Sequence, residues 1–230
     1  MTPSPAGTDA EPAPTRPDDA PAVTDGRVLR ARALRERRRI QLLAAARSVF
    51  AERGYHGTSL QDLLTEARVA RGTFYQYFDS RRACFGAVLA GFVDTLRAAI
   101  APVDVGAATP PRDQLIANLE RVLAVLEADA GLARLLLHEA RGSDPEFDEL
   151  LEDFDARVLG FIKGSLTTGT RLGLVRPCDL ELRATFVLGA LKEAVSQTLL
   201  GRAALRPRAA VARELLDFTL RGVLTDAVVL

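Results

Sequence analysis

Apolar residues recur every three or four positions through most of the chain, a spacing that gathers them on one face of a helix. Glycines and prolines interrupt this pattern and mark the ends of the helices. The pattern predicts nine helices, over residues 28–53, 59–67, 70–78, 81–101, 111–128, 130–141, 144–172, 179–200 and 207–227. Because no strand signal follows Pro102, we expect an all-α fold, with an N-terminal three-helix domain joined to a larger C-terminal helical bundle.

The second and third predicted helices form the most informative segment. Gly54 can end the first helix, since glycine readily accepts the left-handed conformation. Thr58 or Ser59 can cap the second, and Asp62 stands three residues after Ser59, as in a capping box. After a turn at 67–69, the third helix carries hydrogen-bonding and aromatic side chains: Arg71, Thr73, Tyr75, Gln76 and Tyr77. Such a helix fits the major groove of B-DNA, so the segment predicts a DNA-binding switch.

Composition divides the chain into three parts. Residues 1–27 hold half of the prolines and few large apolar groups, so they cannot bury enough surface to offset the entropy of ordering. We therefore expect a disordered tail there. The helix pattern places the candidate helix-turn-helix domain at 28–80 and the effector-binding and dimerisation bundle at 81–230.

The sequence also bears on the compartment. No segment has the order of a signal peptide, and none is apolar over the length of a bilayer, so we expect a cytoplasmic protein. Cys84 and Cys178 both lie in apolar helical patterns. A bridge between them is one alternative, but two reduced thiols are favoured in a chain without an export signal.

Charge is distributed unevenly although the formal net charge is zero. Residues 27–82 carry thirteen arginines against five acidic residues, a net charge of +8, and each flanking part of the chain has a net charge of −4. A basic block confined to one small module is typical of a surface that binds a polyanion. A solvated basic face is the alternative interpretation.

The run from Leu42 to Phe85 resembles the DNA-binding domain of TetR-type transcriptional regulators. Its landmarks are the Glu-Arg-Gly-Tyr that ends at Tyr55, the Thr58-Ser59 helix start, the core A-x-V-x-R-G-T-F-Y, and the Tyr77-Phe78 pair followed by a serine and a basic residue. The resemblance covers about forty-five residues without a gap. It implies a DNA-binding regulator.

Three residues depart from the family pattern. Arg68 stands where the turn usually has glycine, so a left-handed conformation there would cost about 1 kcal/mol. Leu64 replaces a usual alanine. Ala70 replaces a usual serine or threonine cap, a loss of about 1 kcal/mol.

The resemblance implies that residues 70–78 form the recognition helix, supported by 59–67. Arginine pairs with guanine and glutamine with adenine, so three residues are candidates for base edges: Arg71, Thr73 and Gln76. Contacts to phosphate, which fix the register of the protein on DNA, are implied for Thr58, Tyr75, Tyr77 and Arg81. Two alternatives stay open, because Tyr77 could be a core aromatic and Arg71 could be merely solvated.

The resemblance further implies a homodimer formed by the last two helices. Two recognition helices would then lie about one DNA turn apart, on a near-palindromic operator. The candidate interface residues are Phe186, Gly189, Ala190, Leu216 and Leu220. In part, the same residues could belong to the core of one protomer.

Residues 83–175 are implied to hold a small-molecule effector, in a pocket that is mostly apolar with a few polar anchors. Arg134 and His138 are the candidate pocket residues, although a lone histidine on a helix is more often a hydrogen-bonded structural group. Effector entry is expected to shift the fourth helix and lower operator affinity. Repression is the commoner mode of such regulators.

Two other classes of function fit the sequence less well. An enzyme would need a catalytic constellation, and the chain has no glycine-rich phosphate loop, nucleophile elbow or metal-ligand cluster, so no metal or cofactor is expected. A sequence-tolerant DNA-binding protein without small-molecule control is the stronger alternative. Competition between one operator and bulk DNA would distinguish it.

Overall fold

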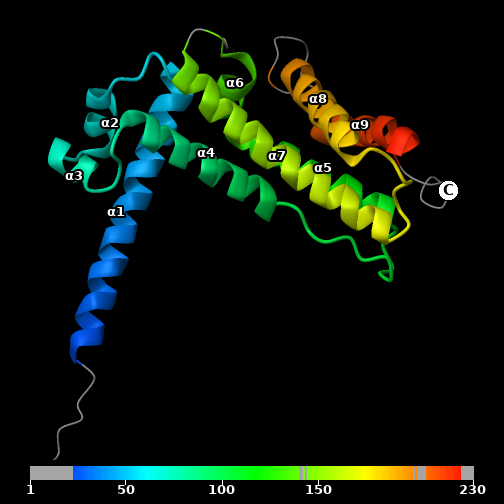
Figure 1. The fold of residues 1–230 in the computed structure, drawn as a ribbon, viewed down its shortest axis with the longest axis horizontal. Coiled ribbons are helices and arrows are strands. Elements are labelled where there is room, and N and C mark those ends of the chain that lie inside the picture. The colour runs from blue at the N-terminus through cyan, green and yellow to red at the C-terminus, as the bar shows by residue number, and fades with distance from the viewer. Residues whose placement is uncertain (1–22, 140–141, 143, 199, 201–205, 224–230) are drawn as a thin grey trace, which may run out of the picture. The chain divides into compact units, whose positions relative to one another are not determined.

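The computed structural model describes residues 23–139, 142, 144–198, 200 and 206–223, with side chains described from 26 to 219 within these ranges. The described residues form nine helices (Figure 1): α1 (Val23–Arg53), α2 (Leu60–Ala67), α3 (Arg71–Tyr75), α4 (Arg81–Ala98), α5 (Pro111–Ala128), α6 (Ala130–His138), α7 (Pro145–Arg171), α8 (Leu180–Thr198) and α9 (Arg208–Val223). The predicted all-α class is confirmed.

Two helices differ clearly from their predicted bounds. α1 begins at Val23, five residues before the predicted start, because extending an existing helix costs less than nucleating one. Residues 23–27 are therefore helical, whereas 1–22 of the predicted tail lie outside the described residues. α3 covers five residues instead of 70–78, because Ala70 is extended and the chain after Tyr75 tightens into a turn.

Internal contacts divide the chain into two units, residues 1–38 and 39–230. In the first unit, the side chains of 27–38 are all exposed. The second unit contains both the predicted helix-turn-helix segment and the bundle that follows it. The functional division that we predicted at residues 27 and 80 is a different one and stays a prediction.

The larger core of the second unit joins α2, α3 and α4 to α6 and α7. Aromatic rings lie at its centre. Phe50 and Phe85 have ring centroids 4.8 Å apart, and Tyr55 and Phe147 are 5.0 Å apart. All four side chains are at most 2% exposed, and each buried ring contributes about 2–3 kcal/mol. Because Phe147 belongs to α7, the bundle shares the core of the predicted DNA-binding segment.

A smaller core lies among α5, α6, α8 and α9. In the bundle, α5 packs along α9, and α7 packs along α8 (Figure 1). Cys84 and Cys178 are both free thiols, the alternative that the sequence favoured. Burial raises the pKa of the Cys84 thiol to about 12, so this thiol stays protonated near neutral pH. Among the described helices, none combines the length and apolar character needed to cross a membrane.

Candidate DNA-binding interface

The start of α2 is fixed by a reciprocal cap, as predicted. The Asp62 N–H donates to Ser59 Oγ at 3.2 Å, and the Ser59 N–H donates to Asp62 Oδ2 at 2.8 Å. Hydrogen bonds from the Ser59 hydroxyl and backbone, with smaller help from Arg53, hold the pKa of the Asp62 carboxyl below its usual range. The cap therefore favours the ionised carboxylate and sets where the helix begins.

The turn between α2 and α3 has the left-handed residue that the sequence comparison anticipated. Arg68 has φ 52° and ψ 47°. Its N–H donates to Thr65 O at 3.2 Å, and the Val69 N–H donates to Leu64 O at 3.1 Å, which closes the last turn of α2. At Ala70, the cap of α3, no side-chain hydrogen bond is made, as the loss of a serine or threonine predicts.

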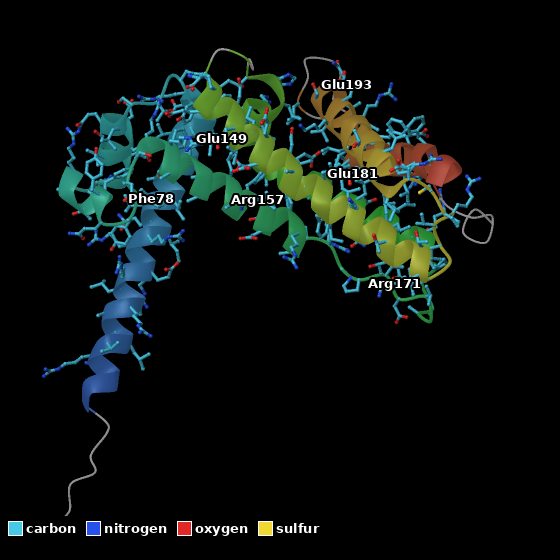
Figure 2. The ribbon with its side chains drawn as sticks, viewed as in Figure 1. Phe78, Glu149, Arg157, Arg171, Glu181 and Glu193 are labelled. Carbon is cyan, nitrogen blue, oxygen red and sulfur yellow. The ribbon has the colours of Figure 1, made fainter. Side chains whose placement is uncertain are left out.

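α3 is held by a buried aromatic pair. Phe74 is 0% exposed and Phe78 is 5% exposed, and their ring centroids are 5.7 Å apart. Figure 2 labels Phe78 beside the beginning of α4, where it joins the larger core. This short helix is therefore anchored by its apolar side and needs little stability of its own.

The opposite side of α3 carries the predicted base-contacting residues. Arg71 and Gln76 are exposed, and Thr73 is half-buried. The Arg71 guanidinium lies over the Tyr75 ring, 5.7 Å from its centroid, a cation–π arrangement that orders both side chains at the surface. Tyr75 itself is 44% exposed, which places it outside the buried stripe as predicted. The helix thus presents polar groups on a rigid apolar support.

The predicted phosphate contacts lie in different surroundings. Tyr77 is half-buried and packs against the larger core, which supports the core-aromatic alternative, whereas its phosphate contact stays a prediction. Thr58 is 1% exposed, and its hydroxyl donates to Gly54 O at 2.7 Å. Arg81 donates to Tyr55 O at 2.8 Å and to Thr58 O at 2.5 Å. Thr58 and Arg81 therefore fasten the turn after α1 in this conformation.

A carboxylate joins this turn to the bundle. Glu139, which follows α6, accepts hydrogen bonds from the backbone N–H groups of Tyr55 at 3.3 Å and His56 at 3.4 Å. The His56 ring lies 3.9 Å from the Glu139 carboxylate and 3.7 Å from that of Asp144, the N-cap of α7. Sequence reasoning missed this junction, because the partners are more than eighty residues apart and no local pattern links them.

The predicted effector-pocket residues both lie on α6. Arg134 and His138 are both exposed on α6. The Arg134 Nε–H donates to Leu200 O at 3.5 Å, and His138 Nε2 lies 3.3 Å from Ser196 Oγ on α8. Both residues therefore link α6 to the end of α8 in this conformation, the structural role that the sequence left open for the histidine.

The predicted dimer residues divide into two groups. On α8, Phe186 is 57% exposed and Gly189 is exposed, whereas Ala190 is half-buried. On α9, Leu216 is half-buried against the smaller core, and the side chain of Leu220 lies outside the described residues.

Other large apolar side chains on α8 and α9 are also exposed. Leu182, one turn before Phe186, is 50% exposed, and Phe218 on α9 is 73% exposed. Figure 2 labels Glu181 and Glu193, which lie on either side of this stretch of α8. Leu182 and Phe186 share one face of α8, and large apolar side chains exposed together are typical of a surface that binds another protein.

Comparisons with known proteins agree with the DNA-binding geometry. The family model described as bacterial regulatory proteins, tetR family, matches residues 42–88. The chain is 31% identical over 160 residues to the HTH-type transcriptional repressor DhaR of Mycobacterium sp. (strain GP1), over 68% of this chain and 80% of that repressor. It is 28% identical over 144 residues to the HTH-type transcriptional regulator HbdR of Aromatoleum sp. (strain CIB). That match covers 63% of this chain and 62% of HbdR, less than two thirds of its length.

A solved structure has the same arrangement of helices. The transcriptional regulator FadR from Bacillus subtilis, in complex with stearoyl-CoA, superimposes with a TM-score of 0.64 and 22% identity. The superposition covers 80% of this chain and 98% of FadR. At this level of identity the likeness shows the fold.

Proposed function

Because the chain belongs to the tetR family of bacterial regulatory proteins and is a DNA-binding transcriptional regulator, we propose that it is a ligand-responsive repressor that binds its operator as a homodimer. Members of this family act by binding rather than by catalysis, and the chain is not an enzyme. We place it in the cytoplasm, where it would have access to DNA.

The observation that carries the proposal is the two-sided character of α3. Phe74 is buried in the core beneath the helix, while Arg71 and Gln76 are exposed on the opposite side. In the proposed complex, these two residues and Thr73 meet base edges in the major groove, and each good pair gives about 1–3 kcal/mol of discrimination.

The phosphate contacts in the proposal come from side chains that reach the surface. Tyr75 and the exposed part of Tyr77 are suited to donate to phosphate oxygens on either side of the base contacts. We propose that Thr58 and Arg81 contribute to DNA binding indirectly, because their hydrogen bonds fix the turn before α2. The functional boundaries at residues 27 and 80 are part of the proposal.

Dimerisation through α8 and α9 completes the proposed mode of binding. The exposed side chains of Leu182, Phe186 and Phe218 would be covered by the same helices of a second protomer. Gly189 is exposed on the same helix and would allow a close approach of the backbones. A two-fold axis there implies a near-palindromic operator.

The effector in this proposal is a largely apolar molecule bound within the bundle. FadR, which shares the fold, binds stearoyl-CoA, a ligand with a long apolar chain. Arg134 and His138 stay in the proposal as polar groups that an effector would have to separate from Leu200 and Ser196. Movement there would reach the turn before α2 through Glu139 and α4.

Selection of bound fragments from the source genome, followed by sequencing, tests the function most broadly. A repressor of this kind should enrich a few near-palindromic sites, preferred over bulk DNA by about a thousandfold or more at physiological salt. Uniform recovery of fragments would instead support a sequence-tolerant binder.

Effector control is tested by saturating the protein with acyl-CoA thioesters of different chain lengths. If none of these thioesters changed operator affinity at fixed salt, an acyl-CoA effector would be ruled out.

A further inference from the structure

We propose that Arg68, in the turn before α3, binds a phosphate group of the DNA backbone beside the base pairs faced by α3. The inference rests on the proposed function, since it assumes that α3 enters the major groove. It adds a DNA contact to that function. The contact comes from a residue whose backbone is strained and whose guanidinium has no polar partner among the described residues.

The backbone at Arg68 is unusual for a residue with a side chain. In the described part of the chain, it is the only residue other than glycine with a positive φ. The left-handed conformation is needed, because the hydrogen bonds from Arg68 and Val69 to the last carbonyls of α2 depend on it. Glycine would make the same turn without the clash between Cβ and the carbonyl oxygen.

The side chain of Arg68 does not offset this strain. It is exposed, and its guanidinium makes no hydrogen bond or ion pair with any described residue. Among described residues, strain of this kind is confined to the turn that leads into the predicted recognition helix. Strained residues persist where the surroundings enforce them and cluster at binding sites, so a role outside the folded chain is the natural explanation.

The surroundings of Arg68 identify the chemistry of its partner. Arg68 borders an open hollow of about 400 Å³, whose lining residues are Gln61, Leu64, Thr65, Arg68, Val69, Ala70 and Arg71. Two of these are cationic and none is acidic. Thr65 donates to Gln61 O at 2.8 Å and Gln61 Nε2 donates to Thr65 Oγ1 at 3.3 Å, so the two guanidinium groups are the charged donors in the lining. Their planar forks match the oxygens of a phosphate group.

The position of the hollow selects DNA phosphate as the ligand. It lies between the C-terminal end of α2 and the first residue of α3, on the side of the turn where Arg71 begins the proposed reading helix. A base contact by Arg71 places the adjacent backbone near the turn, because phosphates border the groove that the helix enters. Arg68 would then fix the register of the helix without reading sequence.

Four variants of the full chain test the assignment. Arg68→Gly removes the charge and the strain, Arg68→Gln removes the charge alone, and Arg68→Lys keeps both the charge and the strain. Arg97→Ala is the matched control, because Arg97 is an exposed arginine near the end of α4 with the same charge. Each variant is titrated with a duplex carrying the selected operator and with an unrelated duplex, over a range of salt concentrations.

Arg68→Gly and Arg68→Gln should bind both duplexes roughly tenfold or more weakly for each protomer engaged. The slope of log affinity against log salt should become shallower by about 0.9 for each protomer. Arg68→Lys should keep most of that slope, and Arg97→Ala should match the unchanged protein. Arg68→Gly should also melt at the same or a higher temperature, an outcome that separates lost binding from lost folding.

Unchanged affinity and salt slope in both Arg68→Gly and Arg68→Gln would overturn the assignment while leaving the proposed function intact, provided that the unchanged protein still prefers its operator. A loss in Arg68→Gly alone would also overturn it, because the backbone and not the charge would then be responsible. An equal loss of affinity in Arg97→Ala would overturn it as well, because the loss of one positive charge anywhere on the protein would then explain the effect. If the unchanged protein showed no preference for any duplex, the proposed function would fail first.

Discussion

The helix-turn-helix segment and the α8–α9 face expose opposite kinds of side chain. In α3, apolar rings are buried and polar groups such as Arg71 and Gln76 are exposed. On α8 and α9, large apolar groups such as Phe186 and Phe218 are exposed. The first surface suits a hydrated, charged partner, because its groups can exchange water for phosphate and base edges. The second suits an apolar partner, and a second copy of the chain is the one that we propose.

The two regions also differ in how they are fastened. The capping box, the Thr58 hydroxyl and Arg81 all bind within twenty-six residues along the chain. In the bundle, the pair of Arg112 and Asp217 is separated by 105 residues. Glu139 and Phe147 are long-range contacts that join the reading segment to the bundle, so its locally fastened turns can stay intact while a rearrangement of the bundle moves the segment. That difference is what a ligand-controlled regulator requires.

The largest expected effect comes from removing the support beneath α3. Phe74→Ala should cost about 3–5 kcal/mol of unfolding free energy, since it empties a fully buried ring site. Urea unfolding followed by circular dichroism measures this. Tyr75→Ala, one residue away and exposed, is the control and should change stability by about 0.5 kcal/mol or less. Equal losses in the two variants would mean that α3 has no buried side.

The apolar face is tested by placing a charge in it. Phe186→Glu should weaken self-association by about 2–3 kcal/mol or more, because each protomer loses a buried ring and gains a charge at the proposed interface. Sedimentation over a range of concentrations gives the effect. Thr95→Glu, at an exposed position of α4 outside α8 and α9, is the control and should leave association nearly unchanged. A Phe186→Glu protein that self-associates normally would rule out this face.

Arg71→Ala tests whether Arg71 contributes to sequence recognition without contributing to stability. It should weaken operator binding by about 1–3 kcal/mol for each protomer and relax the sequence preference at one base pair of each half-site. Its unfolding free energy should stay within about 0.5 kcal/mol of the unchanged protein, because the side chain is exposed. Selection of variant operators with both proteins measures the preference. An unaltered preference at every position would show that Arg71 is only solvated.

The smallest expected effect is at the start of α2. Ser59→Ala should cost about 1 kcal/mol of unfolding free energy by removing the cap. Because the pKa of Asp62 is lowered in the folded chain, its stabilisation is present above its ordinary value of 3.8 and is lost as the pH falls through the lowered pKa. NMR titration of the Asp62 carboxyl in Ser59→Ala should give a pKa nearer that ordinary value. A titration curve identical to that of the unchanged protein would contradict the capping box.

The sequence predicted the reading segment far better than the bundle. The cap at Ser59 and the exposed position of Tyr75 depend on neighbours within one or two turns, so local pattern was sufficient. The left-handed turn at Arg68 was suggested by the family resemblance instead. The end of α3 was less accurate, because the turn after Tyr75 tightens within an otherwise helical pattern.

Contacts over long distances were beyond sequence reasoning. Nothing local indicates that Glu139 binds the backbone before α2, or that His138 meets Ser196 on α8. Thr58 and Arg81 fit a phosphate-binding pattern, yet in the fold their side chains bind backbone carbonyls. Such partners depend on how the helices pack, which periodicity leaves undetermined.

The central claim is that α3 reads a specific operator, and competition binding tests it most directly. A labelled operator duplex is competed with unlabelled operator and with bulk DNA at physiological salt, using the unchanged protein and a double variant, Arg71→Ala with Gln76→Ala. The unchanged protein should prefer its operator by about a thousandfold or more, and the double variant should lose most of that preference while keeping its melting temperature. Equal competition by operator and bulk DNA, or an undiminished preference in the double variant, would contradict the account.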